Sequence, residues 1–180
     1  MAIELLPHEI GWLQAKLLVG LKANMEVSDE MAHAIETGNQ WHDNPAYDGA
    51  IERMKLIDAT YKPVVEMLGN AVEADYPTDI ESIALGSLVR LKDEFESYSA
   101  LVVGSASLGE DDYSKLWASV GENDDDLTLL SAEAPMGAAL VGSEAGSTVT
   151  WEVEAREFSV DVLAVDNRWL AYHIQSLATN

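Results

Sequence analysis

Residues 38–47, GNQWHDNPAY, bring together the residue types in this sequence that are best suited to chemistry in a short turn. Asp43 is a carboxylate that can bind a hard cation such as Mg²⁺, and His42 beside it could form half of an acid/base pair. Adjacent residues in a turn usually point apart, so the His42–Asp43 pair is the weaker hypothesis. Because helical patterns flank the stretch, it is either a plain connector or the working tip of a hairpin.

The rest of the sequence contains no recognisable self-contained active site. GSASLG (104–109) lacks the Lys and Ser/Thr of a phosphate-binding loop, and the four histidines do not have the spacing of a metal pair. GENDDDL (121–127) lacks the alternating oxygens and final Glu of a calcium loop, so we expect a solvated turn there. The absence of cysteine excludes disulfides and thiolate metal sites. We therefore expect a protein that is not an enzyme and has no cofactor of its own.

The charge of the chain limits its partners. The formal net charge is −22; residues 1–74 carry 12 acidic and 5 basic side chains, and residues 75–180 carry 20 and 5. Such a surface repels phosphate backbones, so we expect no direct binding to duplex nucleic acid. A basic protein partner or a salty environment fits better, and the alternative is a surface that only keeps the protein soluble. No signal peptide or membrane-length apolar run is visible, which predicts a soluble, cytoplasmic protein that does not bind membranes.

Two runs of apolar residues at alternating steps of three and four flank the turn. Each run predicts a helix with one apolar seam, and a short break between matched seams predicts an antiparallel coiled-coil hairpin over residues 1–74, with its tip at 38–46. The first seam consists of Ile10, Leu13, Leu17, Gly20, Asn24, Val27, Met31 and Ala34. The second consists of Tyr47, Ala50, Met54, Ile57, Tyr61, Val64, Leu68 and Ala71.

Beyond a linker at residues 75–80, which contains Pro77, the pattern changes to strand-like runs rich in Val, Leu and Thr. Residues 134–146 between them read as a short helix ending in glycines. We predict a small α+β domain over residues 81–166, with an antiparallel sheet covering one helix, and a C-terminal extension at 167–180 that can form an amphipathic helix. The predicted strands are 83–93, 97–105, 127–131, 147–155 and 158–166.

Several motifs, taken in order, resemble the Gre family of bacterial transcript-cleavage factors. The stretch SAEAPMGAALVGSEAGSTVTWEV (131–153) is similar to the family's C-terminal pattern, although Ala134 replaces its usual Ser and Ser147 its usual Asp. IALGSLVRLKD (83–93) is similar to the strand that opens the same domain, and residues 34–50 are similar to the hairpin tip. The matching positions are Gly38, Asn44, Tyr47, Ala50, Gly86, Ser87, Val89, Pro135, Gly137, Ala139, Leu140, Gly142, Gly146 and Val149.

The resemblance implies a fold, a partner and a mechanism. It implies an FKBP-like C-terminal domain that docks on the rim of the secondary channel of RNA polymerase, and a hairpin that enters the channel. Two tip carboxylates then help hold a second, polymerase-bound Mg²⁺, so that the polymerase cleaves its own backtracked RNA. The implied docking residues lie in the segment EAPMGAAL and are Pro135, Met136, Gly137 and Leu140. Leu140 has the stronger case for the core, whereas Met136 fits either role.

The tip departs from the family pattern where the metal would bind. Gly38 and Asn44 are separated by five residues instead of four, and Asp43 stands where the family has Glu. The second acid of the pattern falls on Asn39 or Gln40, each a neutral amide. A lone Asp43 should hold the second Mg²⁺ more weakly than two acids, and only jointly with the polymerase. The residues predicted to act at the polymerase active site are Asn39, Gln40, Trp41, His42, Asp43 and Asn44.

We therefore expect a Gre-like, monomeric factor that regulates or inhibits RNA polymerase, with weak or absent stimulation of cleavage. Trp41 and His42 add bulk at the tip, which fits a protein that blocks the channel. One alternative is a true cleavage factor that uses Asp43. A second alternative is an acidic interaction module that binds some other basic partner.

Overall fold

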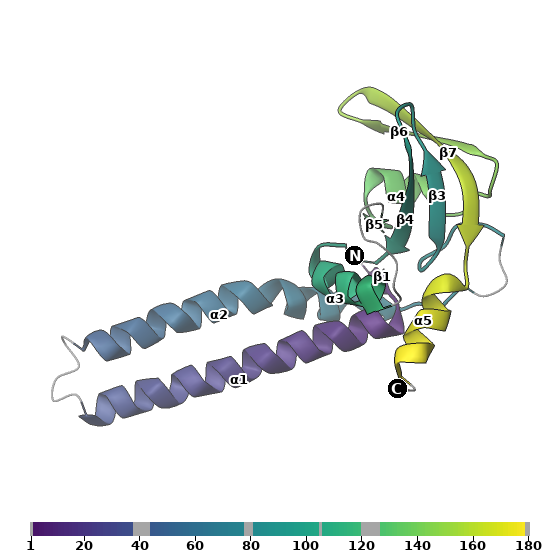
Figure 1. The fold of residues 1–180 in the computed structure, drawn as a ribbon. Coiled ribbons are helices and arrows are strands. Elements are labelled where there is room, and N and C mark those ends of the chain that lie inside the picture. The colour runs from purple at the N-terminus through teal and green to yellow at the C-terminus, as the bar shows by residue number, and fades with distance from the viewer. Residues whose placement is uncertain (1, 38–43, 78–80, 105, 120–126, 179–180) are drawn as a thin grey trace. The chain divides into compact units, whose positions relative to one another are not determined.

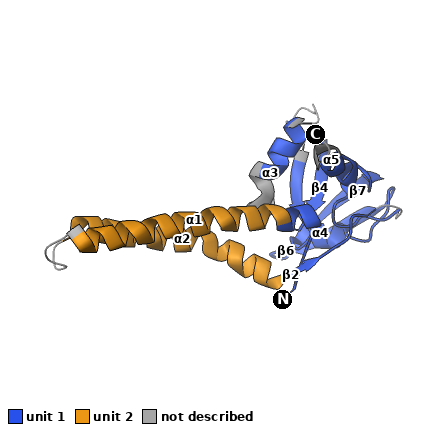
Figure 2. Cartoon of the chain, turned by 90° about the horizontal axis from the view of Figure 1, so that it is seen from below, with its two compact units in different colours: residues 1–10, 71–180 blue, residues 11–70 orange. Residues whose placement is uncertain are grey.

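The computed structural model describes residues 2–37, 44–77, 81–104, 106–119 and 127–178. These residues form two compact units (Figure 2): residues 11–70 form one unit, and residues 1–10 together with 71–180 form the other. We call them the hairpin unit and the sheet unit. No helix in the described parts of the chain is both long and apolar enough to cross a membrane.

The hairpin unit consists of two long helices, α1 (Pro7–Thr37, whose first turn belongs to the sheet unit) and α2 (Pro45–Asn70). They lie side by side along the hairpin (Figure 1). Every residue of the two predicted seams is buried or half-buried, whereas most other positions of these helices are exposed. This confirms the predicted hairpin, because only the seam of each helix is withdrawn from water. On the surface, an ion pair joins Arg53 of α2 to Glu30 of α1.

The middle of the hairpin depends on Gly20. This residue is buried, and a Cβ atom at its position would lie 2.5 Å from the ring of Tyr61 on α2. The missing side chain therefore leaves the space that the Tyr61 ring fills. Gly20 weakens the helix by its flexibility but permits the close approach of α1 and α2.

The sheet unit contains a five-stranded sheet in the order β5-β4-β3-β7-β6. Three of its four strand pairs are antiparallel, as predicted, but β5 runs parallel to β4. The prediction of a wholly antiparallel sheet is thus corrected to a mixed sheet. Parallel neighbours need a crossover connection, and helix α3 (Ala106–Ser119) lies in the chain between these two strands. The five strands are β3 (Leu88–Lys92), β4 (Ser97–Val103), β5 (Leu127–Ser131), β6 (Thr148–Val153) and β7 (Arg156–Asp166).

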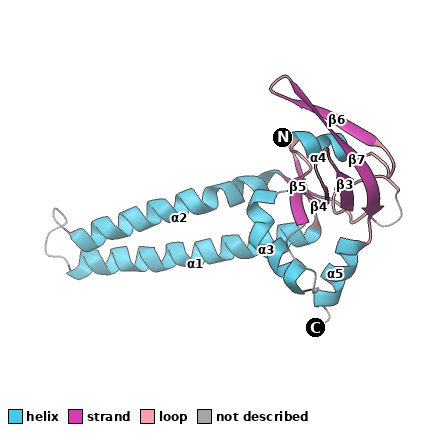
Figure 3. Ribbon diagram, turned by 45° about the horizontal axis from the view of Figure 1, so that its top comes forward, coloured by secondary structure: helices cyan, strands magenta, loops and turns pink. Residues whose placement is uncertain are grey.

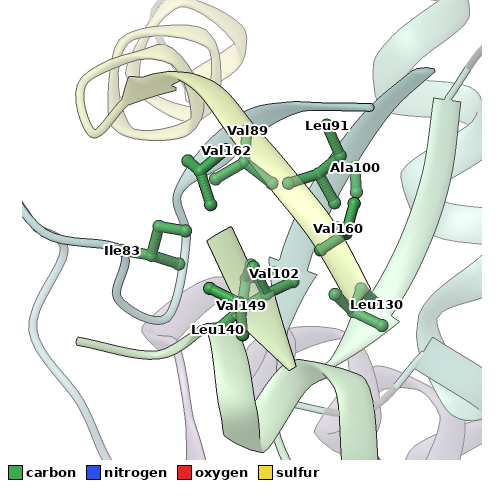
Figure 4. Packing of buried hydrophobic residues seen from close by; sticks show 10 residues of the cluster. All are labelled: Ile83, Val89, Leu91, Ala100, Val102, Leu130, Leu140, Val149, Val160 and Val162. Atoms are coloured by element: carbon green, nitrogen blue, oxygen red, sulfur yellow. The ribbon is translucent and has the colours of Figure 1, made fainter. Parts of the chain in front are cut away.

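One face of the sheet packs on helix α4 (Pro135–Leu140), and this contact forms the core of the unit (Figure 3). The alternate residues Val89 and Leu91 of β3 and Val160 and Val162 of β7 point into it, and Leu140 of α4 meets them from the other side. Figure 4 shows these side chains gathered between strands and helix. The period of two along each strand places one apolar face inward.

The boundary between the units differs from the predicted one at residue 74. Strand β1 (Ile3–Leu5) pairs in parallel with β2 (Ala71–Glu73), so both ends of the predicted hairpin segment belong to the sheet unit. Residues 3–5 and 71–73 thus pair through backbone hydrogen bonds as strands, where the prediction continued the helical hairpin. The sequence signal of β1, three residues long, is too short to separate from a helix start.

The C-terminal extension forms helix α5 (Trp169–Ala178). Its residue Leu170 is fully buried, and the ring of Trp169 lies 4.8 Å from the ring of Trp117 on α3, centroid to centroid. The two helices thus share an aromatic contact. The segment before α5 is fastened to the sheet, since Ser87 donates a hydrogen bond to Asn167, which donates to the carbonyl of Ser82 at 3.1 Å.

Candidate functional site

Asn44 connects the two helix ends at the distal end of the hairpin. Its Oδ1 accepts the backbone N–H of Tyr47 at 3.2 Å, which is the bond of a helix N-cap. Its Nδ2 donates to the carbonyl oxygen of Ala34 near the end of α1, at 2.7 Å. Pro45 follows at the first helical position, where a missing N–H costs nothing. Asn44 therefore bonds to the end of α1 and caps the start of α2, so its side chain has a structural role beside the tip.

The other predicted tip residues lie outside the described residues. These are Asn39, Gln40, Trp41, His42 and Asp43. The predicted metal role of Asp43 and the predicted blocking role of Trp41 and His42 accordingly remain predictions. Within the described parts of the chain, no group of three His, Asp or Glu side chains is placed to hold a metal ion.

The hairpin carries apolar side chains outside its seam. On α1, Leu18 is 67% exposed and Met25 is 70% exposed, and Val19 and Leu21 are also exposed. Large exposed apolar side chains that gather in one region mark protein contact sites. This part of α1 also lacks acidic residues between Glu9 and Glu26, whereas Lys16 and Lys22 are present. This stretch of the α1 surface therefore differs in charge from the acidic remainder of the chain.

The predicted docking segment forms α4, and its residues divide between core and surface. Leu140 is fully buried in the core, and Gly137 is buried where a Cβ would collide with the carbonyl of Ser131. Both residues are thus withdrawn from the surface and support the fold, and their predicted docking role stays a prediction. Met136 is half-buried against the core, and Pro135 is exposed at the start of α4. The available surface of α4 is thus Pro135, Ala138 and the following Val141.

A groove of about 430 Å³ lies beside that surface. We call it the α4 groove. Its lining includes the apolar side chains of Val72 and Leu85 and the carboxylates of Glu4 and Glu133. An apolar groove with acidic groups is suited to a segment of protein that carries both apolar and basic side chains. The remaining lining residues are Ala2, Gly104, Ala132, Ala138 and Val141.

A buried polar cluster fixes the first turn of α1 within the sheet unit. The two ring nitrogens of His8 lie 2.7 Å from the hydroxyl of Tyr76 (Nδ1) and 3.0 Å from the hydroxyl of Tyr113 on α3 (Nε2). Burial lowers the pKa of His8 to about 4, so the ring is neutral at pH 7. A neutral imidazole has one N–H donor and one acceptor nitrogen, which matches two hydroxyl partners.

Glu9, beside His8, is buried and closes the same cluster. Its two carboxylate oxygens accept the backbone N–H groups of Leu6 at 2.8 Å and Gly104 at 2.9 Å. Burial and the charge of Glu9 raise the pKa of Tyr113 well above its usual range, so that hydroxyl keeps its proton. The cluster ties the start of α1 to the end of β4 and to α3.

Sequence reasoning missed this cluster. Tyr76 and Tyr113 lie 68 and 105 residues from His8 in the chain, and only the fold brings them to His8 and Glu9. The available signal was a Glu three residues after Leu6 at the start of an apolar pattern, which is typical of a helix N-terminus. That signal predicts the helix start but not the burial of the carboxylate.

Two features define the class of protein: a long antiparallel helical hairpin, and a small α+β unit whose mixed sheet packs on the short helix α4. The family model "Transcription elongation factor, GreA/GreB, C-term" matches residues 78–167, which is half of the chain. The chain therefore belongs to the GreA/GreB family of transcription elongation factors. As a member of this family it is an accessory factor and not an enzyme in its own right.

The chain is similar to curated members of the family along most of its length. It is 28% identical over 153 residues to transcription elongation factor GreA of Lachnoclostridium phytofermentans, covering 82% of this chain and 86% of that protein. It is 28% identical over 144 residues to GreA of Nitratiruptor sp., covering 78% of each. Both alignments are long enough to include residues of both units.

Solved structures of related factors are also similar. The Gfh1 protein of Thermus thermophilus, a GreA factor homolog, has 20% identity and a TM-score of 0.39, over 92% of this chain and 99% of that one. Thermus aquaticus Gfh1 has 25% identity and a TM-score of 0.38, over 91% and 97%. A GreA/GreB factor of Nitrosomonas europaea has 21% identity and a TM-score of 0.30, over 63% and 91%.

Proposed function

We propose that this protein binds bacterial RNA polymerase at its secondary channel, with the sheet unit at the rim and the hairpin tip directed to the active site. The observation that carries the proposal is the family match over residues 78–167 in a chain whose first part is a long antiparallel hairpin. The similarity to proteins named transcription elongation factor GreA supports the same partner. The exposed apolar side chains of α1 fit a hairpin that works in contact with another protein.

Within that role, we propose a regulator that occludes the channel and not an efficient cleavage factor. The support is the composition of the tip. Asp43 is the only carboxylate between Gly38 and Asn44, and Asn39 and Gln40 are neutral. Two oxygen anions hold a second Mg²⁺ far better than one, because Mg²⁺ keeps most of its water unless carboxylates replace it. Trp41 and His42 supply bulk in the same stretch.

Stalled, backtracked elongation complexes with Mg²⁺ test this role. We expect the protein to bind these complexes and to slow nucleotide addition, with RNA cleavage close to the rate without the factor. Asp43→Ala should leave binding and inhibition unchanged, whereas Trp41→Ala should weaken inhibition. Asp58→Asn, an exposed position along α2, is the matched control for a lost carboxylate.

Two results would contradict the proposal at different levels. Strong cleavage that Asp43→Ala abolishes and Asp58→Asn preserves would establish a true cleavage factor, and the regulator role would be wrong. Failure of the wild-type protein to bind purified core polymerase in a titration would remove the polymerase itself as the partner.

A further inference from the structure

The turn between β3 and β4, with the sequence DEFE, holds an aromatic side chain out in solvent. Phe95 is 90% exposed, more than any other large hydrophobic side chain of the described residues. Burying a Phe side chain stabilises a protein because it removes apolar surface from water. A Phe left in water contributes none of that stabilisation within the monomer. One exposed Phe alone is unremarkable in a protein surface. What distinguishes Phe95 is the hydrogen-bonded turn that holds its backbone in place.

The backbone under Phe95 is fixed by Asp93. The Oδ1 atom of Asp93 accepts the N–H of Phe95 at 2.7 Å and the N–H of Glu96 at 2.8 Å. The N–H of Asp93 donates to the carbonyl of Glu96 at 3.0 Å, which closes the turn. The two hydrogen bonds that the carboxylate accepts, the one from Glu96 first and then the one from Phe95, lower the pKa of Asp93. The carboxylate therefore stays charged and continues to accept both bonds. A side chain on a fixed turn loses less entropy when it binds.

Two more aromatic side chains lie at the same end of the sheet. The register pairs Lys92 of β3 with Asp161 of β7, so the β6–β7 turn extends past the same edge as the DEFE turn (Figure 1). On that extension, Trp151 and Phe158 are cross-strand partners with stacked rings, 5.8 Å apart at their centroids. Phe158 is 43% exposed. Trp151 is half-buried and packs partly against the core, so Phe158 presents the more exposed ring of the pair. We call Phe95, Trp151 and Phe158, which lie at the same end of the sheet, the distal aromatic patch.

Acidic side chains flank Phe95 and also lie on the other face of the β6–β7 hairpin. Glu94 and Glu96 flank Phe95 in the turn. On the β6–β7 hairpin, Glu152 lies directly opposite Glu157, on the face away from Trp151 and Phe158 because successive side chains of a strand alternate between its faces. Like charges in that position destabilise a strand pair. A cationic partner would relieve this repulsion. The whole sheet unit carries 23 acidic and 5 basic residues, so its field attracts cations over a wider range.

We propose that the distal aromatic patch is a protein-docking surface, with Phe95 as its anchor in an apolar pocket rimmed by Lys and Arg on RNA polymerase. The proposal rests on the proposed function and adds a contact separate from the α4 groove. An aromatic centre with a charged rim is the anatomy of a specific protein interface. The same acidic rim disfavours nucleic acid and anionic lipid surfaces, and it also disfavours a second copy of this chain, since two like rims repel.

Titration of purified core polymerase with the labelled full-length protein tests the patch. We expect Phe95→Ala to weaken binding about tenfold, within the range of a hot-spot residue, while the melting curve stays unchanged because Phe95 packs on little. Tyr172→Ala, which removes another exposed aromatic ring on α5, is the matched control and should bind as wild type. Glu94→Gln with Glu96→Gln should weaken binding at low salt and reduce its salt dependence.

The outcomes distinguish a failure of the patch from a failure of the proposed polymerase partner. If the wild-type protein and Phe95→Ala bind the polymerase with equal affinity, the patch is not a docking surface, although the polymerase remains the partner. A photo-crosslinking residue at position 95 gives a second readout, and we expect it to label a polymerase peptide that contains apolar and basic residues. Labelling of an acidic peptide, or of a second copy of this chain, would overturn the proposal.

Discussion

Gly20 and Tyr61 set the distance between the two long helices. A Cβ at position 20 would lie 2.5 Å from the Tyr61 ring, closer than side-chain atoms pack. The ring is half-buried over the glycine, so a larger residue there must displace it. The local cost of glycine in a helix is thereby offset by a closer helix contact.

Substitution of Gly20 therefore has the opposite sign from the usual glycine-to-alanine change. We expect Gly20→Ala to lower the free energy of unfolding of the hairpin by about 1–3 kcal/mol, the typical cost of overpacking. Urea unfolding followed by helical circular dichroism measures it. Gly11→Ala in α1 is the control, because nothing lies within 4 Å of its Cβ position; it should raise stability by about 0.5–1 kcal/mol. A stabilising Gly20→Ala would contradict the packing.

His8 gives the sheet unit a specific sensitivity to acid. Burial lowers its pKa from 6.5 to about 4, so the unfolded chain takes up a proton before the folded one does. Its contribution to stability is complete above pH 6.5 and is lost as the pH falls from 6.5 to 4. At pH 4.5 the loss should be about 2–3 kcal/mol.

The measurement compares wild type with His8→Gln in urea at pH 7 and pH 4.5. Other groups also titrate over this range, so the relevant quantity is the difference between the two proteins. We expect the wild type to lose more stability on acidification than His8→Gln. Equal losses would show that the His8 ring is protonated in the folded protein or is open to water.

The end of helix α4 places a buried residue next to an exposed one. Leu140 is fully buried in the core, whereas its neighbour Val141 is 44% exposed and lines the α4 groove. The same charge placed at adjacent positions should therefore act on different properties. Comparing variants at these two positions therefore distinguishes an effect on binding from an effect on folding.

We expect Val141→Asp to weaken polymerase binding about tenfold with little change in melting temperature, because it puts a charge into the α4 groove, which we propose contacts the polymerase. Leu140→Asp should instead lower the free energy of unfolding by several kcal/mol, since an unpaired carboxylate would be buried. Binding titrations and thermal melts of both variants, with Tyr172→Asp on α5 as a control, measure these effects. Unchanged binding by Val141→Asp would exclude the α4 groove from the interface.

The elements that the sequence predicts well are those with long, regular patterns. The seams from Ile10 to Ala34 and from Tyr47 to Ala71 repeat over several turns, and the structure buries or half-buries every member. Alternation along β6 and β7 predicted those strands for the same reason. Each pattern is local, so neighbouring residues are enough to reveal it.

Features that depend on distant residues could not be predicted in this way. The parallel placement of β5 follows from the helix α3 crossover, and β1 has only three residues. The partners of His8 lie 68 and 105 residues away. For the candidate site, Asn44 and the surface of α4 have defined positions, whereas the chemistry assigned to Asp43 depends on a resemblance and stays a prediction.

The two units differ strongly in charge. The hairpin unit carries 9 acidic and 5 basic residues, and the sheet unit carries 23 and 5. Repulsion among the surplus carboxylates destabilises the compact state. Most of that repulsion acts within the sheet unit.

Salt should therefore stabilise this protein. The screening length falls from about 10 Å at 0.1 M to about 3 Å at 1 M, so we expect the melting temperature to rise over that range of NaCl. Three of the five Trp residues, Trp117, Trp151 and Trp169, belong to the sheet unit. The rise should therefore be larger when unfolding is followed by near-ultraviolet circular dichroism than by the helical signal. A melting temperature that falls with NaCl would show that ion pairs outweigh the repulsion.

The pairing of β1 with β2 has a consequence for the order of events during synthesis. The first ten residues belong to a unit whose other members begin at Ala71, so the ribosome completes the whole hairpin before β1 has a partner. At about 5–20 residues per second, the N-terminal segment waits for several seconds. The carboxylate of Glu9 lacks one of its two backbone donors for longer still, because Gly104 is synthesised later. Both long helices are therefore synthesised in full before β1 can pair with β2, and the contact of Glu9 with Gly104 forms only after β4 has emerged.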